Sequence, residues 1–99
     1  MVRSRFGITV GKRNARRAVD RTLVKRVLRE AARHAAPALD AAAGSDRVDV
    51  VLRLKAPLPP PRELPRPQLA RLVRAEADQL LAQLVRALGS TALTPTAAV

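Results

Sequence analysis

Nine of the 22 residues from Lys12 to Arg33 are lysine or arginine, a density that favours binding to a polyanion. In a helix these cations form two neighbouring rows, with Arg21, Lys25 and Arg29 on one and Arg26 and Arg33 on the other. The opposite side is apolar and holds Val19, Leu23, Val24, Val27, Leu28 and Ala31. Such a helix packs its apolar side on a core and presents its charge outward.

The types of side chain favour a nucleic acid over a lipid surface. Arginine outnumbers lysine seven to two in this window, and guanidinium groups grip phosphate oxygens at two points and stack on bases. An amphipathic membrane helix would carry bulky aromatic residues at its boundary, yet Phe6 is the only aromatic residue of the chain. Stacking platforms for single strands also use aromatic residues, so we expect contacts to backbone and grooves.

Like charges at four-residue spacing repel one another and destabilise a helix slightly. This chain nevertheless repeats them over five turns, at Arg17, Arg21, Lys25, Arg29 and Arg33. An anionic ligand would relieve that repulsion, which supports a binding role for the row.

Length and composition restrict the remaining possibilities. The 99 residues form one domain at most, and the window from Lys12 to Arg33 supplies +7 of the net charge of +11. The absence of cysteine excludes disulfides, thiolate metal sites and a cysteine nucleophile, and fits the cytoplasm, where we expect the protein. The chain has no apolar run of about 18 residues that would span a membrane, and residues 1–11 lack the apolar stretch of a secretion signal.

No group of residues indicates catalysis or metal binding by the chain itself. His34, the only histidine, lies near the end of the expected basic helix, where its charge would interact favourably with the helix dipole. We interpret the acidic residues Asp46, Asp49, Glu76 and Asp78 as solvated surface. The segment Gly11–Ala15 lacks the second glycine and the Gly-Lys-Ser/Thr ending of a phosphate-binding P-loop.

Hydrophobic periodicity predicts strand, basic helix, strand and helix, which is an α+β arrangement. The expected elements are a strand from Arg5 to Val10, a helix from about Arg17 to Ala36, a strand from Arg47 to Lys55 and a helix from about Gln68 to Leu88. Pro37 should stop the first helix, and Gly44 and Ser45 should complete the turn. The six prolines between Ala56 and Pro67 predict an extended loop.

The last helix should bury one stripe and end at a glycine cap. The stripe consists of Leu69, Leu72, Val73, Leu80, Leu84 and Leu88, and Gly89 occupies the cap position. We expect one domain over residues 1–89 and a flexible tail over residues 90–99. Two strands make a marginal sheet, so either further strands join from elsewhere or the helices carry most of the core.

Two segments together resemble the bacterial ribonuclease P protein subunit. The first runs from Arg5 to Arg13, and the family has a strand there of the form Arg-x-Gly-x-x-Val-Ser-Lys-Lys. The second runs from Arg21 to Glu30, where the family has a helix with Arg-Asn-Arg-x-Lys-Arg-x-x-Arg-Glu. The strand from Asp46 and the last helix also match in position, so the resemblance covers roughly residues 5–88.

The resemblance implies a ribosomal-protein-like α+β fold with a left-handed crossover between parallel strands, an exception to the usual handedness. It also implies an accessory subunit of a ribonucleoprotein endoribonuclease that removes the 5′ leader of precursor tRNA. The resemblance implies further that the catalytic RNA and its Mg²⁺ ions perform the chemistry, so we expect no catalytic residues in the protein and no cofactor bound by it alone. The expected partners are the ribonuclease P RNA and precursor tRNA, with no membrane and no obligate protein partner. Family members begin with a further helix and two strands, so we expect this chain to be N-terminally incomplete.

The predicted RNA-binding residues combine the basic pattern with this resemblance. They are Lys12, Arg13, Arg16, Arg17, Arg21, Thr22, Lys25, Arg26, Arg29 and Arg33, with Thr22 adding a hydroxyl to the cations. The chain departs from the family pattern at three positions, with Gly11 for serine, Thr22 for asparagine and Leu23 for arginine. The loop that precedes the helix is also about one residue longer.

Two alternatives stay open. The first is another basic nucleic-acid-binding module, either ribosome-associated or DNA-binding. A helix-turn-helix reader would need a short helix directly before the basic helix, where this chain has the strand from Arg5 to Val10. The second is a truncated relative without function.

Overall fold

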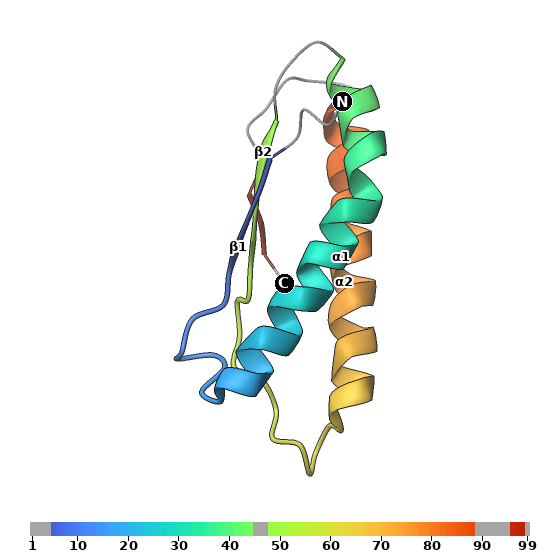
Figure 1. The fold of residues 1–99 in the computed structure, drawn as a ribbon. Helices are drawn as coiled ribbons and strands as arrows, with labels where there is room; N and C mark the ends of the chain where they lie inside the picture. The colour runs from blue at the N-terminus through green and yellow to red at the C-terminus, as the bar shows by residue number, and fades with distance from the viewer. Residues whose placement is uncertain (1–4, 45–47, 89–95, 99) are drawn as a thin grey trace.

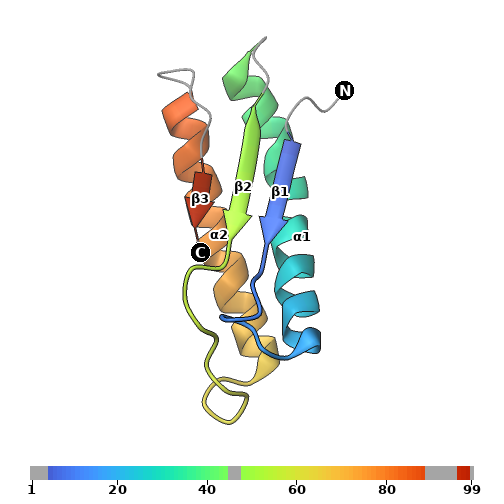
Figure 2. The same ribbon diagram turned by 90° about the vertical axis from the view of Figure 1, so that its left-hand side faces the viewer.

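The computed structural model describes residues 5–44, 48–88 and 96–98. The elements in chain order are β1 (Arg5–Thr9), α1 (Ala18–Ala43), β2 (Asp49–Arg53), α2 (Arg66–Leu88) and β3 (Thr96–Ala98). The strands form one parallel sheet in the order β1-β2-β3, and both helices lie on the same side of it (Figures 1 and 2). This two-layer α+β architecture confirms the predicted fold class.

The chain crosses from β1 to β2 in a left-handed sense. Figure 2 views the open side of the sheet, with the strands pointing down and the helices behind them. The chain descends along β1, ascends at the back along α1 and then descends again along β2, to the left of β1. Because the helix lies behind the strands and β2 lies to the left of the downward-running β1, this crossover is left-handed. The resemblance implied this handedness, which is an exception to the usual right-handed rule.

Alternation along the strands determines which residues form the core. Val48, Val50, Leu52 and Leu54 are buried against the helices, as the period-2 pattern predicted, while the residues between them are exposed. Phe6 and Ile8 of β1 face the same layer but are only partly buried. The difference arises because β2 lies between two strands, whereas β1 is the outer strand of this sheet.

The prediction that Pro37 stops the first helix is wrong. α1 continues through Pro37 to Ala43 and ends at Gly44, whose φ of 66° suits a residue without a side chain. The proline ring lies on the exposed side, so the carbonyl that loses its helical partner can bind water instead. Continuing the helix buries Leu39 completely, and the bend of α1 in Figure 1 is the usual effect of an internal proline.

α2 differs from its prediction at its start and along its stripe. It begins at Arg66, so Pro67 lies in the first turn, where a missing N–H has no cost. Leu72 was expected in the core but is 50% exposed, whereas Ala77 and Leu81 are buried. Only the position of the helix over the sheet decides which edge of a broad apolar stripe is covered. Gly89, the expected cap, lies outside the described residues.

The C-terminal segment contains a strand that was not predicted. Residues 96–98, expected as part of a flexible tail, form β3 and pair with β2 in parallel register, with Thr96 opposite Val51. The remainder of the tail, residues 90–95 and 99, lies outside the described residues. A segment of three residues is too short to show a strand pattern in the sequence. It is extended here because it pairs with β2.

Candidate nucleic-acid interface

The connection between β1 and α1 presents four exposed cations on a fixed backbone. Ala15 is buried, and its N–H and that of Asn14 donate to the carbonyl of Gly11 at 3.1 and 3.2 Å. The amide Nδ2 of Asn14 donates to the carbonyl of Leu54 at 3.0 Å, and the N–H of Leu58 donates to the carbonyl of Asn14 at 2.8 Å. Asn14 thereby joins this basic loop, residues 11–17, to the chain that follows β2. The exposed cations are Lys12, Arg13, Arg16 and Arg17.

Arg21 faces the protein rather than the solvent. Its Nη1 donates to the carbonyls of Ala15 at 2.9 Å and Arg16 at 2.8 Å, and the residue is partly buried. The reason is geometric, because four residues of an α-helix turn the chain about 40° beyond a full circle. A row at four-residue spacing therefore winds around the helix, with Arg21 near the core side and Arg33 far from it. The expectation of one straight cationic row needs this correction.

The middle of α1 carries the cations that are free to meet a ligand. Arg26 and Arg29 are exposed and Lys25 is partly buried, and none of them has a carboxylate or carbonyl partner in the part of the chain that the structure describes. Thr22 is exposed beside them. Val19 was predicted on the apolar side but is 59% exposed, since it lies before the part of α1 that packs on the sheet.

Arg33 is exposed but already paired. Its Nη2 donates to Oε1 of Glu30 at 2.6 Å, and Nε2 of His34 lies 3.1 Å from the same oxygen. Two hydrogen bonds lower the pKa of Glu30, and the one from Arg33 has a larger effect than the one from His34. The same bond raises the pKa of Arg33. An incoming phosphate must therefore compete with Glu30 for this guanidinium.

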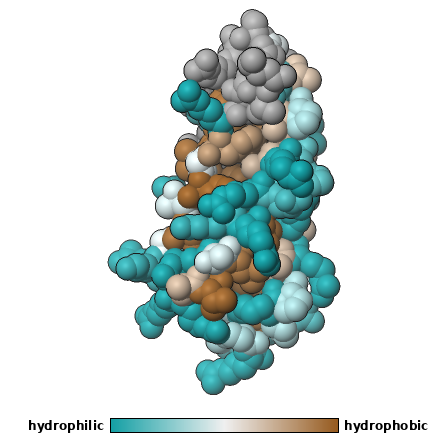
Figure 3. All heavy atoms as spheres, viewed as in Figure 1, coloured by the Kyte–Doolittle hydropathy of each residue, from teal (hydrophilic) through white to brown (hydrophobic). Residues whose placement is uncertain are grey.

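An apolar hollow lies beside the cationic face of α1. It has a volume of about 480 Å³, and Phe6 and Ile8 of β1 face Arg29 and Arg33 of α1 across it. Figure 3 shows hydrophilic side chains gathered over α1 and crossing apolar surface toward β1. The sequence identified Phe6 as the only aromatic residue but gave no sign that it lies beside these arginines, because the order of strands is not readable from periodicity.

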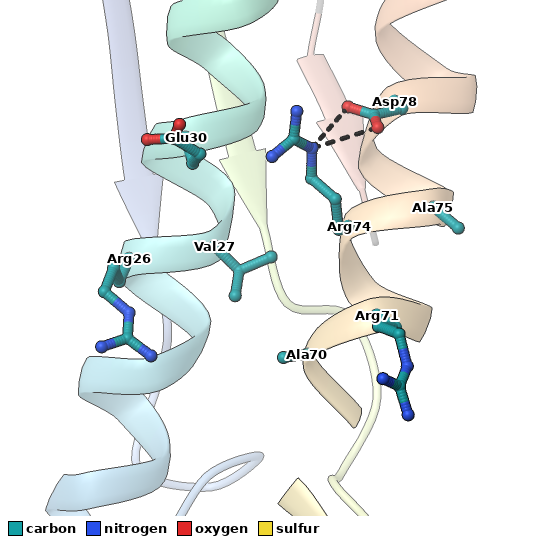
Figure 4. A pocket seen from close by; sticks show the side chains of 8 residues that line it. All are labelled: Arg26, Val27, Glu30, Ala70, Arg71, Arg74, Ala75 and Asp78. Carbon is teal, nitrogen blue, oxygen red and sulfur yellow. Dashed lines mark hydrogen bonds and ion pairs between the residues drawn. The ribbon is translucent and has the colours of Figure 1, made fainter. Parts of the chain in front are cut away.

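A second hollow, of about 550 Å³, separates α1 from α2. Val27 and Ala70 form part of its apolar floor (Figure 4). Its acidic residues are engaged, because Nε of Arg74 donates to both carboxylate oxygens of Asp78 at 2.9 and 3.0 Å. This groove has mixed charge, because Arg26 and Glu30 of α1 line it together with Arg71, Arg74 and Asp78 of α2.

Asp20 and Arg66 form a connection that sequence reasoning missed. Asp20 is only 7% exposed, and its Oδ1 lies 3.4 Å from Nη1 of Arg66. Nη2 of Arg66 donates to the carbonyls of Pro59 at 2.7 Å and Leu64 at 3.0 Å, while Nε and Nη1 have no hydrogen-bond acceptor among the described residues. Arg66 thus ties the proline-rich segment, residues 56–65, to the start of α1. The sequence contained one sign of this contact, because Asp20 is an acidic residue within the basic window from Lys12 to Arg33.

Two groups of exposed or half-exposed cations have no partners among the described residues. The basic loop contributes Lys12, Arg13, Arg16 and Arg17, and α1 contributes Lys25, Arg26 and Arg29. Together they form what we call the cationic surface. It suits a ligand with regularly repeated negative charge, because each guanidinium can bind a phosphate at two oxygens.

Two further features bear on other classes of function. Within residues 5–44, 48–88 and 96–98, no three histidine, cysteine or acidic side chains gather as metal ligands would. Neither helix in the same ranges is apolar over a length that would cross a bilayer.

Comparison with known proteins gives one match. A family model described as Ribonuclease P matches residues 2–89, which is most of the chain. Neither the curated proteins nor the solved structures contain a match. The matched range includes the basic loop, both helices and the connection through Asp20 and Arg66.

Proposed function

The chain belongs to the ribonuclease P protein family, and from this premise we propose that it binds the catalytic RNA of ribonuclease P and precursor tRNA and assists removal of the 5′ leader. The family supports a role in RNA binding and tRNA processing within an endoribonuclease. The finer statement, that this chain contacts both RNAs through its cationic surface, is our proposal. A cytoplasmic location also stays a prediction.

One observation carries this proposal more than any other. Seven cations on the basic loop and α1 have no partner among the described residues, whereas Arg33 and Arg74 are paired with Glu30 and Asp78. Unpaired charges held close together repel one another, so the fold holds a surface that an external polyanion would stabilise. The RNA backbone supplies such a polyanion at the spacing of its phosphates.

The chemistry itself is assigned to the RNA. We propose that Mg²⁺ enters the complex with RNA phosphates and that the protein contributes position and charge. Lys25, Arg26 and Arg29 would neutralise phosphates along α1, and the basic loop would do so at its start. Thr22 would add a hydroxyl contact from the exposed side of α1.

Reconstitution tests this proposal directly. Purified ribonuclease P RNA should cleave the 5′ leader of precursor tRNA faster at low millimolar Mg²⁺ when the chain is added. The variant Lys25→Glu/Arg26→Glu/Arg29→Glu should lose this stimulation while keeping the helical circular dichroism of the parent. No stimulation by the folded parent would contradict the proposal, and selective recovery of duplex DNA or ribosomal RNA from cells would favour the alternative binding modules.

A matched control separates a local surface from overall charge. Arg53→Glu/Arg62→Glu/Arg71→Glu changes the net charge equally, but the three residues lie on β2, the proline-rich segment and α2. All three are exposed. The control should retain most of the stimulation. Equal loss in both variants would mean that the protein acts through its net charge alone.

A further inference from the structure

The proline-rich segment, residues 56–65, connects β2 to α2 and is held in place by contacts with the rest of the chain. Its backbone is held by the carbonyl of Asn14, by Arg66 and by its own turn, in which the N–H groups of Glu63 and Leu64 donate to the carbonyl of Pro60 at 2.9 and 3.1 Å. Prolines further restrict it because each fixes its own φ. The segment is therefore a rigid wall beside the basic loop.

A hollow of about 570 Å³ lies between this wall and the basic loop. Residues 57–61 line one side, and Arg13, Arg16 and Arg17 line the other. The volume falls within the range of about 300–1,000 Å³ that small-molecule sites occupy. One side offers apolar proline rings, and the other offers guanidinium groups that have no acidic partner among the described residues.

An apolar side facing a cationic side matches a nucleotide, which has a flat base and a negatively charged phosphate. We propose that the hollow holds one unpaired nucleotide of the bound RNA, with its base against the proline rings and its phosphate toward the arginines. The inference rests on the proposed RNA-binding function and adds a site to it. Unpaired bases are the part of RNA that proteins insert into pockets, and apolar contact with a base face does not depend on its sequence.

The remaining charged residue in the hollow does not oppose this assignment. Asp20 also lines it, but its carboxylate is buried and faces Nη1 of Arg66 at 3.4 Å. The positive charge of Arg66 offsets the negative charge of Asp20. The net charge of the hollow is therefore set by Arg13, Arg16 and Arg17 and is positive. Because the segment is already rigid, binding does not have to order it, and the entropic cost of binding is lower.

Binding of oligonucleotides with and without bases tests the inference. The full chain is titrated with oligouridylate and with an abasic ribose-phosphate oligomer of equal length, at one salt concentration. We expect the chain to bind oligouridylate about threefold to tenfold more tightly, because only that ligand places a base on the prolines. Pro60→Ala/Pro61→Ala should reduce this ratio to near one, since alanine keeps the carbonyl that accepts the turn hydrogen bonds but removes the rings.

Pro65→Ala/Pro67→Ala is the matched control, because these prolines do not line the hollow and should leave the ratio unchanged. A ratio near one for the parent, or a ratio that Pro60→Ala/Pro61→Ala leaves unchanged, would overturn the inference while leaving phosphate binding intact. Failure to bind either oligomer would overturn the proposed function as well.

A second measurement requires no variant and so does not depend on folding of a changed loop. An oligomer containing 4-thiouridine is photocrosslinked to the parent chain, and the modified residues are mapped. Crosslinks at residues 57–61 or 13–17 are the expected result. Crosslinks confined to other parts of the chain would overturn the inference.

Discussion

Two sets of arginines on neighbouring parts of the molecule differ in what their guanidinium groups contact. Arg21 and Arg66 donate to main-chain carbonyls and are partly buried. Arg26 and Arg29 extend from the middle of α1 without partners among the described residues. The first set maintains the shape of the surface and the second set supplies its charge. Within the window from Lys12 to Arg33, basic residues such as Arg21 and Arg29 therefore have two different roles.

Replacing Arg66 should have the largest effect on stability. Arg66→Ala leaves the buried Asp20 without its counter-charge and removes two hydrogen bonds to Pro59 and Leu64. We expect the free energy of unfolding to fall by about 2–4 kcal/mol, somewhat less than for a fully buried pair because Arg66 retains some exposure. Urea denaturation measures this change, with Arg62→Ala in the same segment as the control. Equal midpoints for both variants would remove Arg66 from the structural set.

Neutralising the middle of α1 should leave stability nearly unchanged but weaken RNA binding. Lys25→Ala/Arg26→Ala/Arg29→Ala removes three unpaired charges and adds residues with high helix propensity. Affinity for ribonuclease P RNA should fall on the order of tenfold to a hundredfold near 0.1 M salt, and the log–log salt slope should become shallower by about 2–3. Fluorescence anisotropy over a salt series measures both. A slope equal to that of the parent would exclude these three residues as phosphate contacts.

A pair of single variants compares the two sets most closely. Arg21→Ala should lower the free energy of unfolding by about 1–2 kcal/mol, because two carbonyls lose a charged donor. Arg29→Ala should leave stability within error and make the salt slope shallower by about 0.7–0.9. Thermal unfolding and RNA titration of both variants give the four values. The division into two sets fails if Arg21→Ala affects only binding or Arg29→Ala affects only stability.

Replacing Glu30 should give the smallest effect, because it changes only the pairing of Arg33. Glu30→Gln frees Arg33, so RNA affinity should rise about twofold to fivefold and the salt slope should steepen by about 0.7–0.9. An RNA affinity equal to or below that of the parent would show that Arg33 does not reach a phosphate.

The pH dependence of Glu30 follows from the same contact. Arg33 and His34 lower its pKa below the ordinary value of 4.5, so its stabilising contribution is complete above that value and disappears as the pH falls through the lowered pKa. Between about pH 5 and pH 3 the parent should therefore lose slightly more stability than Glu30→Gln. Thermal midpoints across this range measure the difference, and parallel curves would contradict the assignment.

The sequence predicted those parts of the fold that depend on local pattern. The alternation through Val50 and Leu52 placed β2 correctly, and the basic amphipathic pattern predicted α1. Pro37 misled the prediction because burial of Leu39 outweighs the local cost of a proline in a helix. β3 was missed because three residues gain their structure from β2 rather than from their own pattern.

The candidate site was predictable in composition but not in arrangement. Counting charges predicted the window from Lys12 to Arg33 as the binding region. Counting did not reveal that Arg21 turns inward or that Arg33 is paired, since both depend on helical rotation and on neighbouring groups. The contact between Asn14 and the chain after β2 joins residues 40 apart, which no local pattern predicts.

The salt dependence of binding tests the central claim most directly, namely that the unpaired cations of the basic loop and α1 bind RNA phosphates. The parent chain is titrated with ribonuclease P RNA over a series of salt concentrations. If about six phosphates are neutralised, the logarithm of the association constant should fall against the logarithm of salt with a slope of roughly −4 to −5. A slope near zero would contradict the account.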